Sequence, residues 1–289
     1  MRGAEEVIGN ADPTGADLAV PPRPRRRPRP LRKLLGDFWQ SRELLRNLVA
    51  RDLKIRYKDS ILGFAWSMVT PLATVLVFGF IFTRVFEVTN TADFSLFFLA
   101  GFLPWQFLSG SIAESVGAIV GNGPLMRQVN FPREYLPLSK VSSQAIHFVL
   151  SLGVLSVYAL VRGYNFFPFL PVLALAILFH ALFVAGMSMA FAAANVAFRD
   201  LQELVPVMLL LWFYGSPLFY RLEMVPAEWR WLILLNPMTW FLDLYRHVFY
   251  YLVVPPTKVM AVAAFLGVAS TAVGYLLFVR LARTFSKEL

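Results

Sequence analysis

The chain has 289 residues, of which 57% are hydrophobic and 16% are charged. A typical soluble domain has about 45–50% apolar and about 25% charged residues. With a mean hydropathy of +0.59, the chain has more apolar surface than a soluble fold of this size can bury, so we expect a membrane protein with several spans. In a soluble protein the net charge of +9 would indicate a nucleic-acid partner. Here many of the positive charges precede the first apolar segment, and we expect no nucleic-acid partner.

The sequence also excludes several classes of enzyme and binding site. The chain has no Cys, which excludes disulfides, thiolate metal ligands and a cysteine nucleophile. None of its Lys residues follows a Gly, so there is no Walker A loop to bind ATP. The three His residues lie far apart without a carboxylate cluster, so we expect no metal site. We therefore expect no catalytic residue, and no metal or cofactor bound by this chain.

The N-terminal part divides into two segments. Residues 1–30 are rich in Pro, Gly and Arg and have no apolar period, which predicts a disordered cytoplasmic tail. In residues 31–58, apolar side chains recur at helical spacing while basic side chains occupy the other faces; the apolar positions are Leu44, Leu45, Leu48, Val49 and Leu53. This pattern predicts an amphipathic helix that lies in the membrane interface.

Six long apolar windows follow, at residues 61–83, 94–118, 141–161, 170–194, 203–220 and 259–279. A helix needs about 20 apolar residues to cross a hydrocarbon core of about 30 Å. Residues 221–257 hold a shorter apolar run, interrupted at Asn236-Pro237 and crowded with Trp and Tyr. We predict an all-α membrane protein with a transmembrane domain at 59–289. It has six transmembrane helices and a re-entrant or interfacial helical hairpin at 221–257.

The distribution of Lys and Arg predicts the orientation. Most of the 27 basic residues fall in the N-terminal segment, the C-terminus and the loops after the second and fourth windows. With six spans these segments share one side, so we expect both termini in the cytoplasm and the hairpin outside.

Two links on the cytoplasmic side could transmit motion. The loop 121–140 is short, rich in Gly and Pro, and of mixed charge, so a partner pressing on it would move both flanking helices. An ordinary connecting loop is the alternative. The link 195–203 makes the fourth and fifth spans an antiparallel hairpin with Arg199 and Asp200 at its mouth. An ion pair there would contribute only about 0–1 kcal/mol, so stability explains it poorly.

Four segments carry a family resemblance. They are 51–58 (RDLKIRYK) with Ser60, Leu62-Gly63, Trp66 and Pro71; 130–138 (NFPREYLPL); Arg199-Asp200 with Ser216-Pro217 downstream; and Asn236-Pro237. In this order, from about residue 40 to the C-terminus, the chain resembles the permease subunit of bacterial ATP-binding-cassette polysaccharide exporters. These are the exporters of O-antigen, teichoic acid, capsule and similar cell-wall glycans.

The resemblance implies a complex in the bacterial cytoplasmic membrane. Two permeases form a channel, and two copies of a separate nucleotide-binding subunit hydrolyse ATP with Mg²⁺, so this chain would not itself be an enzyme. The cargo would be a glycan on a polyprenyl pyrophosphate lipid. The amphipathic helix would act as a gate helix and the hairpin would cap the outer channel mouth. Contact with the ATPase would involve Asn130, Phe131, Pro132, Arg133, Glu134, Arg199 and Asp200.

Two further sets of residues are candidates for contact with such a cargo. Basic side chains of the gate helix could attract a pyrophosphate headgroup, with simple positive-inside anchoring as the alternative; they are Arg51, Lys54, Arg56 and Lys58. Aromatic faces suit the C–H surfaces of sugars in a channel, with lipid-facing positions as the alternative. The candidates are Trp66, Phe78, Trp212, Phe213 and Tyr214.

Other functions remain as alternatives. The same architecture could export a drug or a lipid. A secondary transporter would need ionisable groups deep in the membrane, and only Glu114 approaches that position. A membrane-bound glycosyl- or phosphotransferase would need an acidic metal-binding cluster, whereas the acids expected outside are scattered along the chain.

Overall fold

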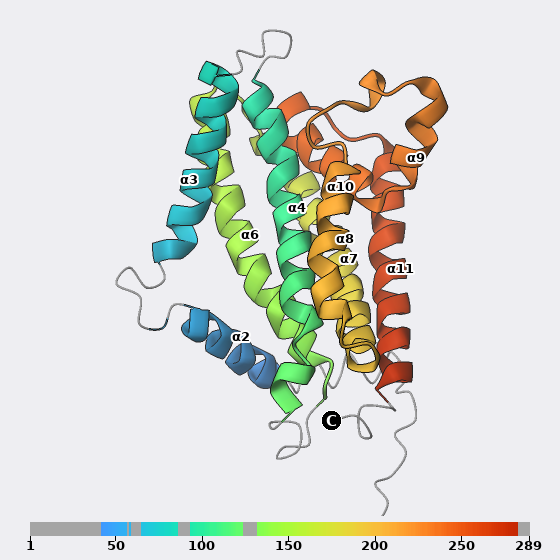
Figure 1. The fold of residues 1–289 in the computed structure, drawn as a ribbon. Helices are drawn as coiled ribbons and strands as arrows, with labels where there is room; N and C mark the ends of the chain where they lie inside the picture. Colours follow the sequence, from blue (N-terminus) through green and yellow to red (C-terminus); the bar gives the residue numbers. More distant parts are fainter. Residues whose placement is uncertain (1–41, 57, 59–64, 86–92, 124–131, 283–289) are drawn as a thin grey trace, which may run out of the picture.

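The structure is a computed structural model that describes residues 42–56, 58, 65–85, 93–123 and 132–282. Within these residues all the regular structure is helical and no strand occurs, which confirms the expected all-α class. The long helices run side by side in one bundle (Figure 1). The tail 1–30 and the first part of the predicted amphipathic helix lie outside the described residues.

Four of the described helices are long and apolar enough to cross a membrane. They are α4 (Phe94–Val116), α6 (Tyr135–Val161), α7 (Leu170–Ala197, preceded by the 3₁₀ turn Phe167–Phe169) and α11 (Thr257–Leu281). They coincide with the second, third, fourth and sixth predicted windows. At a rise of about 1.5 Å per residue, each is longer than a hydrocarbon core of about 30 Å.

The first and fifth windows correspond to shorter helices. The first contains α3 (Trp66–Phe80), continued by the π-helical turn η2 (Ile81–Val85), and the fifth contains α8 (Leu201–Tyr214). Helix α8 ends early because Pro217 lacks a backbone N–H and disfavours the helical conformation at Ser216. The count of six spans therefore stays a prediction.

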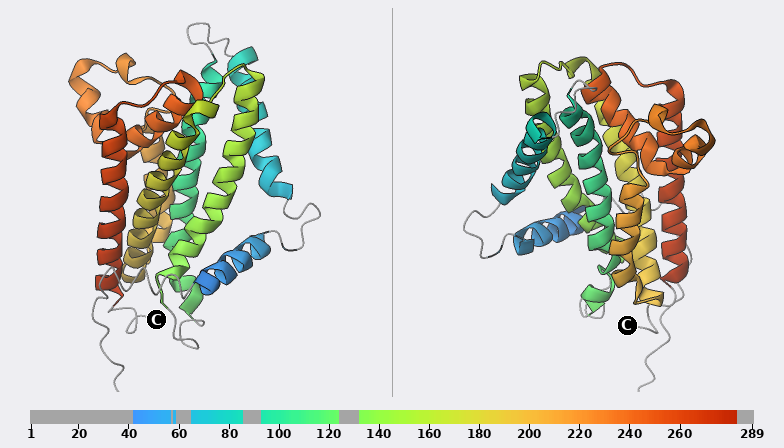
Figure 2. Two further views of the ribbon diagram at one scale, coloured as in Figure 1. Left: turned by 180° about the vertical axis from the view of Figure 1, so that it is seen from behind. Right: turned by 45° about the horizontal axis from the view of Figure 1, so that its top comes forward.

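Helix α2 (Arg42–Arg56) lies obliquely across one end of the bundle, beside the first turns of α6 (Figures 1 and 2). Its Leu48 is buried together with Ala118, Tyr135 and Leu136. The apolar face of α2 therefore packs against the protein, whereas Lys54 and Ile55 are exposed. The last turns of α4, α7 and α11 and the first turn of α8 lie at the same end, which we call the α2 end (Figure 1).

Helices α7 and α11 pack against each other almost without intervening side chains. A Cβ atom added at Gly186 or Gly274 would come within 3.0 Å of the backbone of the other helix, closer than real Cβ atoms approach their neighbours. Two hydroxyls of α11 bond to carbonyls of α7: Ser270 to Phe183 at 2.9 Å and Thr271 to Leu182 at 2.8 Å. Such close packing of small residues is a common way to join helices in membranes.

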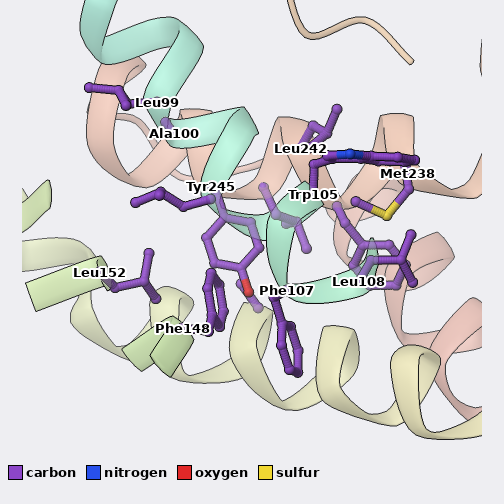
Figure 3. Close-up of a cluster of buried hydrophobic side chains, with 14 of the residues drawn as sticks. Leu99, Ala100, Trp105, Phe107, Leu108, Phe148, Leu152, Met238, Leu242 and Tyr245 are labelled. Atoms are coloured by element: carbon purple, nitrogen blue, oxygen red, sulfur yellow. The ribbon is translucent and has the colours of Figure 1, made fainter. Parts of the chain in front are cut away.

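The segment between α8 and α11 enters the bundle. It contains the short turns η5 (Leu222–Met224) and η6 (Ala227–Trp229), then α9 (Arg230–Leu235), α10 (Pro237–Arg246) and the π-helical turn η7 (His247–Tyr251). Trp231 and Leu235 of α9 are exposed, whereas Met238, Leu242 and Tyr245 of α10 are buried (Figure 3). The break at Asn236-Pro237 thus separates an outer helix from one that forms part of the core, at the end of the bundle opposite α2.

Candidate functional site

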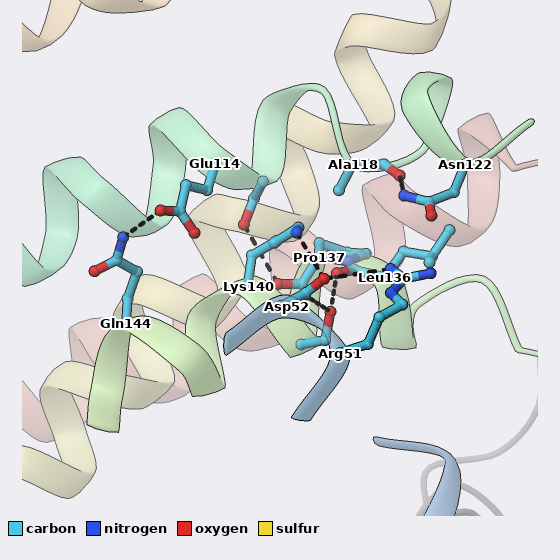
Figure 4. A network of polar contacts seen from close by, with 11 residues as sticks. Arg51, Asp52, Glu114, Ala118, Asn122, Leu136, Pro137, Lys140 and Gln144 are labelled. Carbon is cyan, nitrogen blue, oxygen red and sulfur yellow. Dashed lines mark hydrogen bonds and ion pairs between the residues drawn. The ribbon is translucent and has the colours of Figure 1, made fainter. Parts of the chain in front are cut away.

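A buried carboxylate connects α2 to α6 at the α2 end (Figure 4). The side chain of Asp52 is only 5% exposed, and its Oδ1 lies 2.9 Å from Lys140 Nζ. Arg51 Nη2 approaches the same oxygen at 3.3 Å. Ser139 Oγ lies 3.0 Å from Asp52 Oδ2 and 2.9 Å from the Leu136 carbonyl, so one hydroxyl proton serves two acceptors. A charge this deeply buried needs such partners, and α2 therefore has a defined seat on α6.

The polar contacts continue along α6 toward the middle of the bundle. Gln144, one turn after Lys140, donates a hydrogen bond of 2.7 Å to Glu114 of α4 (Figure 4). Ser115 of α4 donates to the carbonyl of Pro137 at 3.3 Å. The first turns of α6 therefore bind both α2 and α4, and movement of these turns would be passed to both neighbours.

Some of the residues expected to contact an ATPase belong to the described part of the chain, and these lie at the α2 end. Pro132, Arg133 and Glu134 directly precede α6 and are half-buried. Arg133 Nη1 donates to the carbonyl of Ala282, which follows α11, at 3.4 Å. Arg199 and Asp200 are exposed in the turn from α7 to α8. Asn130 and Phe131 lie outside the described residues.

The basic residues of α2 are not equivalent. Arg51 has a side chain that is 37% exposed and is engaged with Asp52. Lys54, within α2, and Lys58, just after it, are exposed. The side chain of Arg56 lies outside the described part of the chain.

Four of the five aromatic candidates belong to one network of ring contacts, which is centred on α4. Phe78 of α3 lies 4.8 Å from Phe98 and 5.3 Å from Phe102, measured between ring centroids. Phe102 contacts Phe213 of α8 at 6.4 Å. Phe213 contacts Tyr214, and Trp212 contacts Trp105. Trp66 lies twelve residues before Phe78 on α3, about 18 Å away along the helix, and is 45% exposed.

Asn236 connects the end of α8 to the start of α10. Its Oδ1 accepts hydrogen bonds from Trp212 Nε1 at 2.8 Å and from the backbone N–H of Met238 at 2.9 Å, which caps α10. Its Nδ2 donates to the Gly215 carbonyl at 3.0 Å and to Ser216 Oγ at 2.9 Å. The sequence marked Asn236 as part of a break in an apolar run and of a resemblance, and the structure gives it a physical role in joining α8 to α10.

Much of the apolar surface of α3 and α8 is uncovered within the described chain. Helix α8 has one fully buried residue, Val205. An apolar hollow of about 380 Å³ lies where α8 meets α4 and α7, and its lining includes Ile112, Phe191 and Met208. On α3, Leu76 and Phe80 are 60% and 61% exposed. These two helices therefore present their apolar sides to a lipid or to another protein.

Helices of this length and hydropathy define an integral membrane protein. The described residues contain no cluster of His, Cys, Asp or Glu that could hold a metal ion. The family model of the ABC-2 type transporter matches residues 43–250, and the chain belongs to this family.

The most informative relatives are named export proteins. The chain is 30% identical over 253 residues to the O-antigen export system permease protein RfbA of Klebsiella pneumoniae, covering 86% of this chain and 95% of the relative. It is 36% identical over 235 residues to the protein of the same name from Myxococcus xanthus, covering 80% and 90%. It is 24% identical over 210 residues to the polysialic acid transport protein KpsM of Escherichia coli, covering 69% and 78%. The resemblance stated from the sequence is thereby confirmed.

Proposed function

We propose that this chain is the channel-forming permease subunit of an ATP-driven exporter. It moves a polysaccharide linked to polyprenyl pyrophosphate across the bacterial cytoplasmic membrane. The observation that carries the proposal is the similarity to O-antigen permeases, which extends over 95% of one relative and 90% of another. The lipid carrier is the finer part of the proposal, and it rests on the resemblance together with the exposed basic residues of α2.

Hydrolysis of ATP belongs to a separate subunit in this proposal. The sequence has no Walker A loop, so ATP and Mg²⁺ would bind to a nucleotide-binding partner. The proposed contact surface comprises residues 130–134 with Arg199 and Asp200. Its described members lie at the α2 end, where a single partner could press on both links at once.

The seat of α2 on α6 supports a route for coupling. Residues 132–134 run directly into α6, and Asp52 attaches α2 to the second turn of that helix. Movement of the loop by the ATPase would therefore move α2 as well. The exposed Lys54 and Lys58 would attract the pyrophosphate headgroup on this side, which we take as cytoplasmic along with both termini.

The second copy in the proposed homodimer would cover α3 and α8. Both helices are short and leave apolar surface exposed, as Leu76, Phe80 and Leu211 show. The partly exposed members of the aromatic network would then face the channel, where sugar rings can stack on them; they are Phe78, Trp212, Phe213 and Tyr214. With α3 and α8 counted, each permease has six spans, and the 221–257 hairpin caps the outer mouth.

Purification from native membranes in a mild detergent, followed by mass spectrometry, tests this function. We expect a Walker A protein in a one-to-one ratio with the permease, and ATPase activity in the complex. Removal of this chain from the cell should leave glycan on its lipid carrier at the cytoplasmic face. Reproducible purification without such a partner, under conditions that preserve other ATP-driven pumps, would refute the proposal.

A further inference from the structure

A buried arginine lies at the end of the bundle opposite α2. Arg246, the last residue of α10, is 5% exposed. Its Nη2 donates to the Leu218 carbonyl at 3.1 Å and its Nε to the Phe97 carbonyl at 3.4 Å. The guanidinium carbon lies 3.6 Å from the centroid of the Phe97 ring, which is a close cation–π contact. These contacts hold the side chain in place, and none of them is to a carboxylate.

A second arginine approaches the same ring. The guanidinium carbon of Arg221 lies 5.6 Å from the centroid of Phe97 and 5.6 Å from that of Tyr250. Arg221 Nη2 donates to the Tyr250 hydroxyl at 2.7 Å. Unlike Arg246, Arg221 is half-buried, so solvent or a ligand can reach it. Two guanidinium groups thus gather around the first turn of α4.

No carboxylate of the described residues forms a direct ion pair with these two arginines. Among the described residues, no carboxylate lies within 4.0 Å of the guanidinium nitrogens of Arg221 or Arg246. Asp243, one turn before Arg246, lies 3.5 Å from His247 Nδ1, and its charge acts on Arg246 without a direct ion pair. Buried charges in proteins are normally paired, whereas the direct contacts of Arg246 are to carbonyls and an aromatic ring. Arg246 already clamps α10 to the carbonyls of Phe97 and Leu218, and Arg221 brings a second positive charge to the same ring.

We propose that Arg221 and Arg246 form a binding site for the phosphate of a lipid headgroup at this end of the bundle. The planar guanidinium group matches phosphate through two parallel hydrogen bonds, and a second positive charge strengthens the attraction. Arg221 makes the direct contact, and Arg246 supplies the charge behind it. The inference deepens the proposed function and rests on it for the cargo: a lipid phosphate that has crossed the membrane would be received at the end opposite its entry.

Native mass spectrometry of the full-length chain in a phosphate-free maltoside detergent tests the site. The two probes are polyprenyl phosphate and phosphatidylglycerol, each titrated separately. We expect wild-type protein to retain at least one of them, and Arg221→Gln to weaken that retention at least tenfold. The control is Lys258→Gln, which removes one exposed positive charge at the same end and should leave retention unchanged. Preference for polyprenyl phosphate assigns the site to the cargo, and preference for phosphatidylglycerol assigns it to a bilayer lipid.

The test does not depend on correct folding of a core variant. Arg246→Lys keeps the charge but loses the planar fork, and it is compared only if its thermal midpoint matches that of the wild type. Arg221 is half-buried, so Arg221→Gln carries the test alone if Arg246→Lys fails to fold. The site would be overturned if Arg221→Gln retained each lipid as well as the wild type and Lys258→Gln do. Lipid binding is measured without an ATPase, so failure of the lipid site would not contradict the proposed function. Conversely, absence of an ATPase partner would not contradict a measured lipid site.

Discussion

Separating Asp52 from Lys140 should uncouple ATP hydrolysis from transport. The side chains of Asp52 and Lys140 are 5% and 23% exposed, and their charged atoms are 2.9 Å apart. Breaking a fully buried pair costs about 3–5 kcal/mol. Lys140 can still reach water, so we expect Asp52→Asn to lower the free energy of unfolding by about 1–3 kcal/mol. Lys140→Met should cost more, because it leaves the more deeply buried charge of Asp52 with only the longer contact from the partly exposed Arg51.

The double variant separates the pair from its members. If the two side chains act together, Asp52→Asn with Lys140→Met should be more stable than the sum of the single effects predicts, by about 0.5–3 kcal/mol. Stability is measured as the thermal midpoint of the purified complex. ATP hydrolysis is measured in proteoliposomes, and export is measured as the amount of glycan at the cell surface. We expect hydrolysis to persist while export falls. Lys54→Met, which removes an exposed charge from the same helix, is the matched control for stability.

Two results would refute this reasoning. Additive effects of Asp52→Asn and Lys140→Met would show that the ion pair does not join the helices energetically. Normal export by both variants at normal protein levels would show that attachment of α2 to α6 is not needed for coupling, whatever its contribution to stability.

Three other predictions test separate parts of the fold. Gly186→Ala should lower the thermal midpoint and the yield of folded protein, because the new Cβ has no room against α11; Gly153→Ala on α6, with no atom within 4 Å of its Cβ, should have no such effect. Asn236→Asp should destabilise the α8–α10 junction by about 1–3 kcal/mol, since it loses both donors to Gly215 and Ser216, and hydrogen exchange should rise at that junction first. Partial burial lowers the pKa of His247, but hydrogen bonds to Asp243 and its charge outweigh it and raise the pKa overall. This contribution to stability is complete below about pH 6.5 and is lost as pH rises through the folded-state pKa, so the thermal midpoint should fall in that direction, and less so in Asp243→Asn.

The sequence predicted those helices whose signal is local. Residues 141–161 and 259–279 were recognised as spans because length and hydropathy alone distinguish them. The same criteria placed the start of α6 at 141, whereas the helix begins at Tyr135. Its first turns carry Ser139 and Lys140, which are polar because they hold α2. A hydropathy average assigns such residues to a loop, because it takes no account of the carboxylate of Asp52, which is distant in the sequence.

The pairings that build the sites depend on distance in space. Asp52 and Ser139 are 87 residues apart in the sequence, and neither residue type is unusual in its own segment. Arg246 follows a run of aromatic residues that is typical of an interfacial helix, and only the packing of α10 against α4 and α7 shows that it is buried. A single Arg between the aromatic residues of α10 is a weak signal of this burial, because a charged side chain there is equally compatible with exposure. The burial became informative only because the structure places both Arg246 and Arg221 against the ring of Phe97.

The packing also indicates which helices can move during transport. Helices α7 and α11 touch through Gly186 and Gly274 with no room for a side chain between them, so they can slide or separate only by losing the bonds from Ser270 and Thr271. Helix α8 has one fully buried residue and borders an apolar hollow, and α2 is attached chiefly at its seat on α6. A force applied before Tyr135 would therefore be transmitted through α6 to α2 and α3, which both pack against it. In the proposed exporter, a channel that opens along α3 and α8, which carry the aromatic candidates Phe78 and Phe213, would change the spacing of the surfaces proposed to face the sugar, while α7 and α11 keep the bundle intact.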